Sequence, residues 1–459
     1  MEKRSVDTVI LGGGPAGYSA AFFAADVGEQ VLVVDDHGSP GGVCLRSGCI
    51  PSKALLHATD VVREVKLSRA RGIDYSEPEI HLRLLREWCE GIIASLETGL
   101  TQQLKAREVE VLEGRGYFED QTTLRVETNG QQEYITFKHA LIATGSDPLI
   151  PQPLDIGHPN VITSDKALKL DRIPEKLLVV GGGYIGLELG TVFASLGSKV
   201  TLVEEKDALL PGVGRELSEP LLHEFEDLAS QVFLSTRVKE LSTSGSSLKA
   251  KFEGEHQQAE EFDYVLVATG RKPRTENLGL EDIGVSRDEI GFIKTGKRFQ
   301  TDVNNIFAIG DVVGGELLAH SAFREGEVAI GVSLLNSHDD LTDTVIPKVV
   351  YTDPEVAWCG YQPEATDDTV YSATVPWKAS GRALTMDKPY GVTKITAEKE
   401  SGRIVGAGIT GPHAGELISE LVVAIELRAT VMDLARIIHP HPTLSETVYE
   451  CARQLALQR

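Results

Sequence analysis

The first part of the chain alternates apolar runs with a helical pattern of small residues. The apolar run Asp7–Leu11 leads into Gly12–Gly17, and a helix pattern follows from Tyr18 to Val27. A second apolar run, Val31–Val34, ends at Asp35. Continuous apolar runs of this length are typical of parallel strands with helices on both faces. The pattern therefore predicts a β-α-β unit.

The same unit recurs in the middle of the chain. Leu177–Val180 is apolar, Gly181–Gly186 repeats the glycine spacing, and a helix pattern continues to Leu196. The next apolar run, Val200–Val203, again ends in an acid, Glu204. The chain is therefore predicted to contain two copies of one structural unit.

Each copy is closed by an apolar strand that ends in Ala-Thr-Gly, Leu141–Gly145 in the first copy and Leu266–Gly270 in the second. The first copy is longer before this strand, and the extra length includes two cysteines. We predict an α/β fold with two Rossmann-like domains and a C-terminal α+β domain that has an interface role. The predicted segments are 1–149 with the cysteines, 150–272, a central region 273–343 that returns to the first domain, and 344–459.

Glycines at G-x-G-x-x-G spacing have a physical role in dinucleotide binding. They allow the tight turn after the strand, the close approach of a pyrophosphate, and close packing of helix on strand. The phosphates then lie at the N-terminus of the helix. Asp35 and Glu204 stand at the end of the second strand, where a carboxylate binds a ribose hydroxyl. Both copies are predicted to bind a dinucleotide.

The two copies are expected to bind different dinucleotides. The cysteines of the first copy have to exchange electrons with a tightly held redox ring, which predicts FAD there. A nicotinamide nucleotide is then expected in the second copy. Glu204 and Glu205 repel a 2′-phosphate and no arginine follows them directly, so NAD is favoured over NADP. The alternative role of Glu204 is a solvated strand end.

Two cysteines, Cys44 and Cys49, stand just before a predicted helix whose first turn accommodates Pro51. Thiols near a helix N-terminus experience the positive end of the helix dipole, which favours the thiolate. The alternatives are a structural disulfide and two buried thiols. A bridge over so short a loop adds only about 2 kcal/mol. A close pair in a chain with five cysteines favours redox chemistry.

The second half of the chain carries a third cofactor-like segment and then changes character. A strand over Ile306–Gly310 leads into Asp311, which is placed either to bind a cofactor hydroxyl or in a turn. A helix is predicted from Leu317 to Leu335, and the polar loop Asn336–Asp343 is a predicted boundary. Beyond it we predict strands over Lys348–Tyr351, Val370–Val375, Gly391–Thr396 and Ile404–Ile409, and helices around Gly415–Arg428 and Val431–Ile438.

The last segment, from Ile438 to Glu446, has three alternative roles. Thr443–Glu446 fits a T-x-x-E capping box. His439 and His441 form a His-x-His pair that invites a metal, but no further cluster of ligands stands near, so none is expected. The chemical alternative is that His441 acts as a general acid/base and is oriented by Glu446.

Composition excludes several classes of function. The chain has 459 residues, 41% of them hydrophobic, and no apolar run is long enough to cross a membrane. The net charge of −23 argues against nucleic acid and anionic membranes, and it suits either a basic protein partner or simple solubility. The N-terminus enters a strand without the apolar region of a signal peptide, so a cytoplasmic protein is expected.

These motifs together resemble the class I pyridine nucleotide–disulfide oxidoreductases, from about residue 5 to residue 455. The resemblance rests on the segment G-G-V-C-L-x-x-G-C-I-P-S-K, both glycine motifs, A-I-G-D and H-P-H-P-T-L-S-E. It departs at Arg46-Ser47, where Asn-Val is usual, at Asp35, where glutamate is commoner, and at Tyr184, where an aliphatic residue is usual.

The resemblance implies roles for particular residues: Cys44 exchanges with the substrate thiol, Cys49 faces the flavin, and His441 acts in the site of the opposite subunit. The implied catalytic residues are Cys44, Cys49, His441, Glu446, Lys53 and Glu188. The implied FAD contacts are Gly12, Gly14, Pro15, Ala16, Gly17, Asp35, Gly42, Lys53, Gly116, Thr144, Gly145, Ser146, Asp311, Leu318, Ala319 and His320. The implied NAD contacts are Gly181, Gly183, Tyr184, Ile185, Gly186, Glu188, Glu204, Val238 and Gly270.

Within the family the chain most resembles the flavoenzymes that oxidise protein-bound dihydrolipoyl groups with NAD. That resemblance implies one tightly bound FAD per subunit, an obligate homodimer that shares its active sites, and a lipoyl-bearing acyltransferase of a 2-oxo acid dehydrogenase complex, or glycine cleavage, as partner.

Four rivals stay open. Mercuric reductase has a pair of cysteines near its C-terminus, whereas in this chain Cys451 stands alone there. Glutathione reductase would require basic residues after the position of Glu204 in order to bind NADP. A nicotinamide transhydrogenase would have no use for the His441–Glu446 pair. A scaffold protein with a structural flavin would have no use for Cys44 and Cys49.

Overall fold

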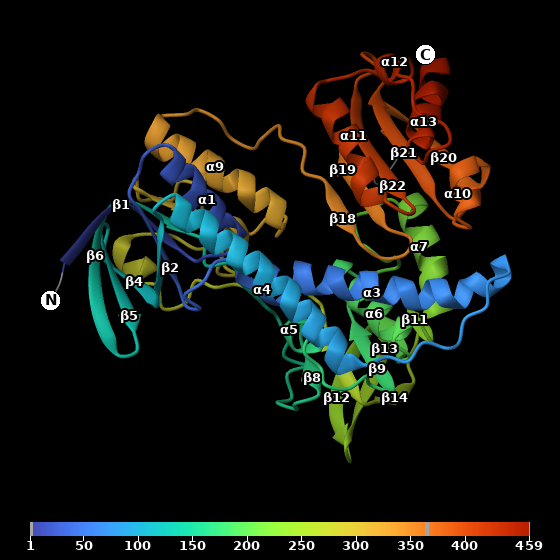
Figure 1. The fold of residues 1–459 in the computed structure, drawn as a ribbon, viewed down its shortest axis with the longest axis horizontal. Coiled ribbons are helices and arrows are strands. Elements are labelled where there is room, and N and C mark those ends of the chain that lie inside the picture. The colour runs from blue at the N-terminus through green and yellow to red at the C-terminus, as the bar shows by residue number, and fades with distance from the viewer. Residues whose placement is uncertain (1–2, 363–366, 459) are drawn as a thin grey trace. The chain divides into compact units, whose positions relative to one another are not determined.

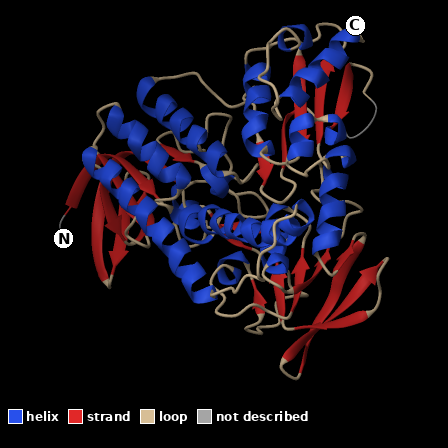
Figure 2. Ribbon diagram, turned by 45° about the vertical axis from the view of Figure 1, so that its right-hand side comes forward, coloured by secondary structure: helices blue, strands red, loops and turns tan. Residues whose placement is uncertain are grey.

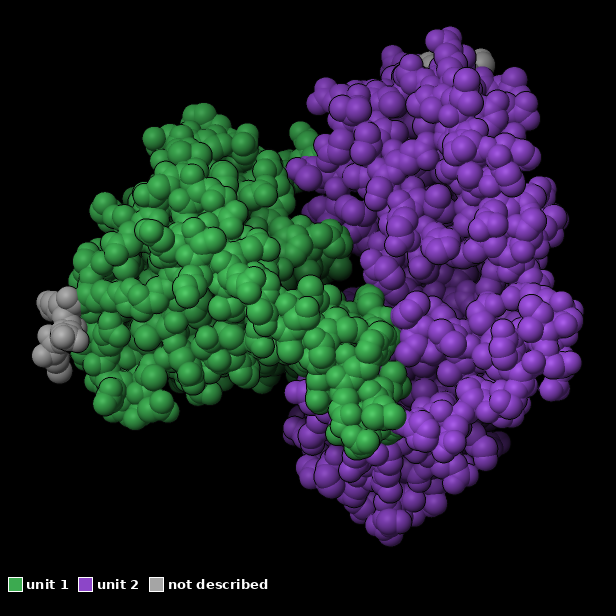
Figure 3. All heavy atoms as spheres, viewed as in Figure 1, with its two compact units in different colours: residues 1–54, 82–149, 270–343 green, residues 55–81, 150–269, 344–459 purple. Residues whose placement is uncertain are grey.

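The computed structural model describes residues 3–362 and 367–458 (Figure 1). Helices and strands alternate along most of the chain, as the predicted α/β class requires (Figure 2). The chain divides into two compact units (Figure 3). Unit 1 comprises residues 1–54, 82–149 and 270–343, and unit 2 comprises residues 55–81, 150–269 and 344–459. The finer division into four segments stays a prediction.

Unit 1 is organised around a sheet of seven strands. They are β1 (Lys3–Leu11), β2 (Val31–Asp35), β3 (Glu110–Glu113), β4 (Arg115–Asp120), β5 (Thr123–Thr128), β6 (Gln131–Ile142) and β17 (Ile306–Ala308). The order is β3-β2-β1-β6-β5-β4, and β17 also pairs with β6. The strands β3, β2, β1, β6 and β17 run parallel, and β5 and β4 extend the sheet in antiparallel fashion.

Apolar side chains from both faces of this sheet are buried, which explains the continuous apolar runs in the sequence. Val9 and Leu11 belong to one core cluster and Ile10 to another. The remaining elements of unit 1 are α1 (Pro15–Asp26), α2 (Gly42–Ser47), α4 (Leu82–Ala106), α8 (Leu280–Ile283), η2 (Gly310–Val313), α9 (Ala319–Leu335) and the ribbon of β7 (Ser146–Pro148) with β16 (Arg271–Pro273).

The cysteine segment differs from the prediction that both cysteines precede one helix. Cys44 lies inside α2, and Cys49 is the first residue of α3 (Cys49–Ser68), which continues into unit 2 and is followed by η1 (Arg69–Arg71). Gly48 separates the two helices, and a Cβ there would lie only 3.0 Å from the carbonyl oxygen of Val43. The chain therefore makes two helices because this glycine permits a tight corner between them.

Unit 2 contains the second Rossmann-like sheet. Its parallel strands are β8 (Val161–Ile162), β9 (Lys176–Val180), β10 (Lys199–Val203), β11 (Gln231–Phe233) and β15 (Tyr264–Val267), in the order β11-β10-β9-β15-β8. A separate antiparallel sheet follows β11, made of β12 (Thr236–Ser244), β13 (Ser247–Gly254) and β14 (Ala259–Phe262). The helices are α5 (Ser164–Ala167), α6 (Tyr184–Ser195) and α7 (Arg215–Leu228).

The C-terminal part of unit 2 is the predicted α+β fold. Its strands are β18 (Lys348–Val350), β19 (Val356–Gly360), β20 (Val370–Pro376), β21 (Val392–Glu398) and β22 (Ile404–Thr410), in the antiparallel order β18-β19-β22-β21-β20. Its helices are η3 (Trp377–Ala379), α10 (Gly381–Thr385), α11 (Ala414–Glu426), α12 (Val431–Leu434) and α13 (Glu446–Leu457). Helix α11 packs on β19 and β22, and α13 packs on β20 and β21 (Figure 1).

The elements of this part that were not predicted are β19, η3, α10 and α13, and one predicted helix ends early. The sequence analysis missed β19, because Val356–Gly360 is too short to show an alternating pattern of its own. The helix expected over Val431–Ile438 ends at Leu434, and Ile437 and Ile438 are exposed rather than packed on the core. The segment that carries the two histidines is therefore non-helical from that point on.

Helix α7 links the parallel five-stranded sheet of unit 2 to the antiparallel sheet of its C-terminal part. The hydroxyl of Thr410 donates to the carbonyl oxygen of Leu217 over 2.7 Å, and the side chain of Leu217 fills the space that a Cβ on Gly408 would need. Lys394, which is only 8% exposed, pairs with Glu216. No helix in the described parts of the chain is long and apolar enough to cross a bilayer.

Glu355 is a half-buried acid that holds the start of α11. Its Oε2 accepts a hydrogen bond of 2.9 Å from the backbone N–H of Gly415. Burial raises the pKa of Glu355 to about 7, and the neighbouring carboxylates of Glu416, Asp60 and Asp353 add to this effect while the Gly415 amide opposes it. This acid is therefore expected to titrate close to neutral pH.

The raised pKa predicts that unit 2 loses stability as the pH rises from about 4.5 to about 7. The folded state holds the Glu355 proton more tightly than the unfolded state, so the free energy of unfolding falls over this window and is level above it. At 1.36 kcal/mol per unit the fall is about 3 kcal/mol. Glu355→Gln keeps the acceptor but cannot ionise, so its thermal unfolding midpoint should fall less over this range. Glu450→Gln on α13 is the control and should keep the wild-type profile, and parallel profiles for wild type and Glu355→Gln would contradict the assignment.

Candidate active site

The outer glycines of the first motif are required by the fold itself. A Cβ on Gly12 would lie 2.3 Å from the carbonyl oxygen of Ala143, and one on Gly17 would lie 1.8 Å from the carbonyl oxygen of Gly12. The middle glycine, Gly14, has only the Cα of Gly42 nearby, 3.9 Å from the position of a Cβ. Packing within the protein therefore explains Gly12 and Gly17 but leaves Gly14 with open space.

The second motif has the same steric design. A Cβ on Gly181 would lie 2.5 Å from the carbonyl oxygen of Ala268, and one on Gly186 would lie 2.0 Å from that of Gly181. Around the middle glycine, Gly183, no described atom comes within 4 Å of a Cβ. Space beside the middle glycine of both motifs fits a pyrophosphate that approaches the backbone closely.

The helices that follow the glycine motifs offer free N-termini. Their N-cap residues are Gly14 for α1 and Gly183 for α6, and in both helices, which are described in full, no side chain caps the N-terminus and the first turn carries no acid. The first backbone N–H groups and the positive end of the dipole are thus available to phosphate groups.

Both strand-end acids hold the glycine loop in place. Asp35 Oδ2 accepts a 2.7 Å hydrogen bond from the backbone N–H of Gly13, and Glu204 Oε2 accepts one of the same length from Gly182. The second oxygen of each acid accepts from the amide two residues further on. Each carboxylate oxygen keeps a lone pair for a ribose hydroxyl, so these positions fit the predicted dinucleotides.

An arginine lies near the second acid pair in space, although none follows it in sequence. Arg237 of β12 is 3.8 Å from Glu205 and also forms a pair of hydrogen bonds with Glu253. The carboxylates of Glu205 and Glu253 neutralise this arginine, so it offers little free charge to a 2′-phosphate. Of the other residues predicted to contact NAD, Val238 lies in β12, Tyr184 and Ile185 open α6, and Gly270 begins the last segment of unit 1.

Ser146 and Asp311, both predicted to contact FAD, meet in unit 1. Asp311 is the second residue of the η2 turn and accepts a hydrogen bond from the hydroxyl of Ser146. Arg271 donates to the Ser146 hydroxyl over 2.6 Å and lies 3.6 Å from Asp311. Arg271 was not predicted, because its role depends on the pairing of β16 with β7 and it belongs to no motif of its own.

Glu325 is a second residue that the sequence analysis missed. It is 9% exposed on α9 and accepts hydrogen bonds from the Gly310 amide over 2.6 Å and from the Ser321 hydroxyl over 2.8 Å. Burial raises the pKa of Glu325. It fixes the turn that carries Asp311. The signal that could have identified it is an acid on the helix face that otherwise carries small and apolar residues.

The remaining residues predicted to contact FAD are all in unit 1. Thr144 donates its hydroxyl to the carbonyl oxygen of Arg274 over 2.7 Å, and Leu318 is the N-cap of α9. The others lie in the α1 N-terminal turn (Pro15, Ala16), in the α2 N-terminus (Gly42), in α3 (Lys53), in β4 (Gly116), after β6 (Gly145) and in the first turn of α9 (Ala319, His320).

Cys44 and Cys49 are partly buried and form a hydrogen bond with each other. This hydrogen bond, together with burial, raises the pKa of Cys44, and the positive charge of Lys53 opposes the shift. Cys44 is the third residue of α2 and so lies close to a helix N-terminus. The hydrogen bond with Cys49 and burial raise its pKa all the same, so the expected stabilisation of the Cys44 thiolate is not borne out. Tyr18 of α1 was not predicted to lie near the cysteines. Burial, and to a smaller extent the charge of the nearby Cys44 and Cys49, raise the pKa of Tyr18 to about 12.

The predicted partners Lys53 and Glu188 lie in different units. Glu188 is 3% exposed in α6, and its Oε1 accepts a 3.1 Å hydrogen bond from the backbone N–H of Tyr351. The pairing of Glu188 with Lys53 stays a prediction.

His441 and Glu446 form the predicted pair. Nδ1 of His441 is 2.8 Å from Glu446 Oε1, and Glu446 Oε2 accepts a 2.8 Å hydrogen bond from the Thr443 amide. These two contacts lower the pKa of Glu446. The capping alternative is thus half right, because one carboxylate both holds the Thr443 backbone and orients the imidazole. The His441 side chain is 79% exposed.

The neighbouring His439 has a different environment. Its side chain is 6% exposed, with Nε2 2.7 Å from Glu420 Oε1 and Nδ1 3.1 Å from the carbonyl oxygen of Ile437. It anchors the loop to α11. Within residues 3–362 and 367–458, no group of three or more His, Cys, Asp or Glu side chains is arranged to hold a metal.

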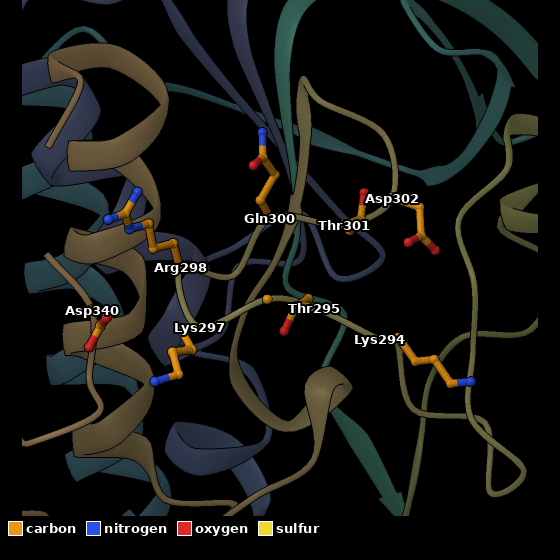
Figure 4. Close-up of a pocket in the computed structure, with 9 residues that line it drawn as sticks. Lys294, Thr295, Lys297, Arg298, Gln300, Thr301, Asp302 and Asp340 are labelled. Carbon is orange, nitrogen blue, oxygen red and sulfur yellow. The ribbon is translucent and has the colours of Figure 1, made fainter. Parts of the chain in front are cut away.

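A separate pocket of about 600 Å³ lies in unit 1 between residues 294–302 and Asp340. Figure 4 shows that its charged side chains do not converge: Lys297 lies on the side of Asp340, and Lys294 points away from both. The pocket also contains none of the predicted site residues, so we do not assign it to the active site.

The chain belongs to the pyridine nucleotide-disulphide oxidoreductase family. The family model with that description matches residues 6–326, and the model for the family's dimerisation domain matches residues 346–452. The dimerisation match covers the C-terminal α+β fold, and it supports a homodimer.

Curated relatives narrow the comparison. A dihydrolipoyl dehydrogenase of Vibrio parahaemolyticus is 41% identical over 98% of this chain and 95% of its own, and one of Geobacillus stearothermophilus is 39% identical over 97% and 95%. Among solved structures, LpdA from Mycobacterium tuberculosis has a TM-score of 0.90 at 27% identity, covering 98% of this chain and 100% of its own. The flavoprotein disulfide reductase RclA from Escherichia coli has a TM-score of 0.86 at 26% identity, covering 97% and 99%.

The steric design of the second motif predicts opposite effects for two similar substitutions. Gly183→Ala should leave the thermal unfolding midpoint unchanged but weaken NAD(H) binding about tenfold or more, because the methyl group occupies the space kept for phosphate. Gly186→Ala should instead destabilise the protein, since its Cβ collides with a backbone carbonyl. Equilibrium titration with NADH and thermal unfolding measure both. Unchanged NADH affinity in Gly183→Ala would show that this space is not the phosphate site.

Proposed function

We propose that this chain is a dihydrolipoamide dehydrogenase, which oxidises protein-bound dihydrolipoyl groups and reduces NAD. The observation that carries the proposal is the contact between the dithiol segment and the first glycine motif: a Cβ on Gly42 would lie 2.6 Å from the Cα of Gly14. A cysteine pair that starts on a dinucleotide loop is positioned for electron exchange with that dinucleotide. The curated relatives of this name, alike over nearly the full length, support the choice of substrate.

The first site fits FAD and the second fits NAD. Gly14, the α1 N-terminus and Asp35 would hold the FAD pyrophosphate and ribose, and Ser146 with Asp311 would contact the rest of the cofactor. Gly183, the α6 N-terminus and Glu204 would hold NAD in the same way, and the neutralised Arg237 favours NAD over NADP. When bound, FAD passes the electron pair of the dithiol to NAD.

His441 is the proposed base for the substrate thiol. Its Nδ1 must donate a proton to the Glu446 carboxylate, so the neutral ring presents the lone pair of Nε2. The exposed ring can therefore take a proton from a dihydrolipoyl thiol. Since thiol–disulfide exchange needs the thiolate, this proton transfer starts the reaction.

Two exchange steps then complete the oxidation. The substrate thiolate attacks Cys44 of the Cys44–Cys49 disulfide, which forms a mixed disulfide and releases Cys49 as a thiolate. The second substrate sulfur attacks the mixed disulfide while its proton passes to the departing Cys44, which closes the lipoyl ring and releases Cys44 as a thiol, with the first proton on His441 and Cys49 as a thiolate. The substrate has lost two electrons and two protons, and both cysteines are reduced. Because the disulfide stores the electron pair between half-reactions, ping-pong kinetics are expected.

The exposure of His441 in the protomer supports a site completed by a second subunit. The dimerisation domain that carries this residue is the part of the chain expected to make the homodimer. The lipoyl group would arrive on a separate protein, an acyltransferase of a 2-oxo acid dehydrogenase complex, in a cytoplasmic setting. Lys53 and Glu188 are proposed to act near the flavin and the nicotinamide.

The substrate assignment predicts a clear order of rates. Turnover should be fastest with dihydrolipoamide and NAD, and at least a hundred times slower with NADP because two carboxylates face the 2′-position. Steady-state assays with dihydrolipoamide, glutathione and mercuric ion, each with both nicotinamide nucleotides, measure this order. Faster turnover of glutathione or mercuric ion would reject the proposal in favour of a different reductase.

The proposed base predicts a specific loss of rate. His441→Gln should lower kcat with dihydrolipoamide by about 10² to 10⁴, the usual contribution of a general base, and leave bound FAD unchanged. Cys44→Ser and Cys49→Ser should abolish turnover. Cys89→Ser, which alters a buried cysteine of α4 outside the site, is the matched control and should retain activity. If His441→Gln turns over at the wild-type rate, His441 is not the base.

A further inference from the structure

Arg46, the residue that departs from the family pattern beside Cys44, joins three parts of unit 1. Its guanidinium donates to Glu97 of α4, with Nε 3.3 Å from Oε1. Its Nη2 donates to the Ser39 hydroxyl over 2.9 Å, to the Ser39 carbonyl oxygen, and to that of Pro40 at 3.4 Å. The Ser39 hydroxyl in turn donates to the same oxygen of Glu97 over 2.6 Å.

This cluster holds one end of α2, and the other end is held by glycines. At the start of the helix, the Gly41 amide donates to the carbonyl oxygen of Gly13 over 2.7 Å, and Gly42 packs directly against Gly14. At its end, Arg46 is tied to α4 and to the loop that enters α2. Cys44 lies between the two attachments, and Cys49 follows the corner at Gly48.

The Arg46 attachment is partly shielded from water. The side chain of Arg46 is 20% exposed and that of Glu97 is 31% exposed. A planar guanidinium can bind the carboxylate and the loop carbonyls at the same time. The asparagine that is usual in the family is too short to make this set of contacts, so the attachment is a property of this chain.

We propose that Arg46 is a positioning residue that keeps Cys44 and Cys49 in place for ring closure when their disulfide is open. This inference rests on the proposed redox role of the pair. Reduction breaks the S–S bond, the dihydrolipoyl dithiol supplies two electrons and two protons, and the covalent link between α2 and α3 is lost. The Arg46–Ser39–Glu97 cluster persists, because none of its members takes part in the exchange.

When two thiols are held close together, the effective concentration of one at the other is high. This favours the disulfide over the open dithiol. Loss of the Arg46 attachment lets the segment sample other conformations in the dithiol state. The disulfide should then become easier to reduce, and the equilibrium with lipoamide should shift towards the protein dithiol. A merely structural role would lower the unfolding temperature without shifting this equilibrium.

The test compares the thiol–disulfide equilibrium of holoenzyme variants in mixtures of dihydrolipoamide and lipoamide. Free thiols are alkylated at equilibrium and Cys44 and Cys49 are counted by mass spectrometry. We expect Arg46→Asn to shift the equilibrium constant about tenfold towards the dithiol, which corresponds to about 30 mV for a two-electron couple. Arg46→Lys should give a smaller shift, because it keeps the charge but loses the planar fork.

Two further variants test the cluster, Glu97→Gln alone and combined with Arg46→Asn, and Arg83→Ala is the control. Glu97→Gln should shift the equilibrium in the same direction, and the double variant with Arg46→Asn should shift it no further than Arg46→Asn alone, because the residues act through one cluster. Arg83→Ala removes a different arginine of α4, which pairs with Glu87 far along the helix from the contact, and should leave the equilibrium unchanged.

The outcomes separate this inference from the proposed function. If wild-type protein shows no reversible Cys44–Cys49 couple, the proposed function fails. If the couple is present but Arg46→Asn has the wild-type equilibrium constant, or if Arg83→Ala shifts it equally, the positioning role of Arg46 is refuted while the proposed function stands.

Discussion

The close contact between the backbones of Gly14 and Gly42 is the constraint on which the chemistry of unit 1 depends. Neither residue has a side chain, so the start of the dithiol helix can lie directly on the turn that is built to bind phosphates. The left-handed conformation of Gly42, with φ of 59°, brings the chain into this contact at no steric cost. The cysteines follow two and seven positions later, so the cysteine pair lies close in sequence to the point of contact with the glycine motif.

The two glycine motifs share one arrangement of contacts that leaves room for a phosphate group beside the backbone. In each, a strand-end carboxylate holds the amide of a glycine, the outer glycines pack against backbone carbonyls, and the middle glycine borders open space. A phosphate-bearing ligand needs bare backbone amides and a helix N-terminus without competing acids, and both units supply them. What distinguishes the copies is the inserted dithiol segment in the first and the acidic surroundings of Glu204 in the second.

The histidine segment shows how environment separates two similar residues. His439 and His441 stand two positions apart, and each pairs with a glutamate. His439 is buried with contacts at both ring nitrogens, whereas His441 is exposed with one nitrogen held by Glu446. The first fixes the loop, and the second keeps a ring nitrogen accessible, as its proposed role as a base requires. A similar contrast holds for Glu325 and Asp311. The buried Glu325 binds the Gly310 amide and so fixes the turn that carries the more accessible Asp311.

The sequence by itself determined the two Rossmann-like units and the α+β end, because periodicity and glycine spacing are local properties of the chain. Short motifs, which are also local, singled out the cysteine pair and the His441–Glu446 pair, and the family resemblance supplied their roles. It did not determine the contacts of Arg46 with Glu97, of Arg271 with Ser146, or of Arg237 with Glu205, because each joins residues whose proximity exists only after strands and helices have packed. The split of the cysteines between two helices also depended on a steric corner at Gly48 that no periodic pattern records. Patterns report which face of an element is buried, whereas the partners of polar side chains are decided by the packed fold that brings them within hydrogen-bond distance.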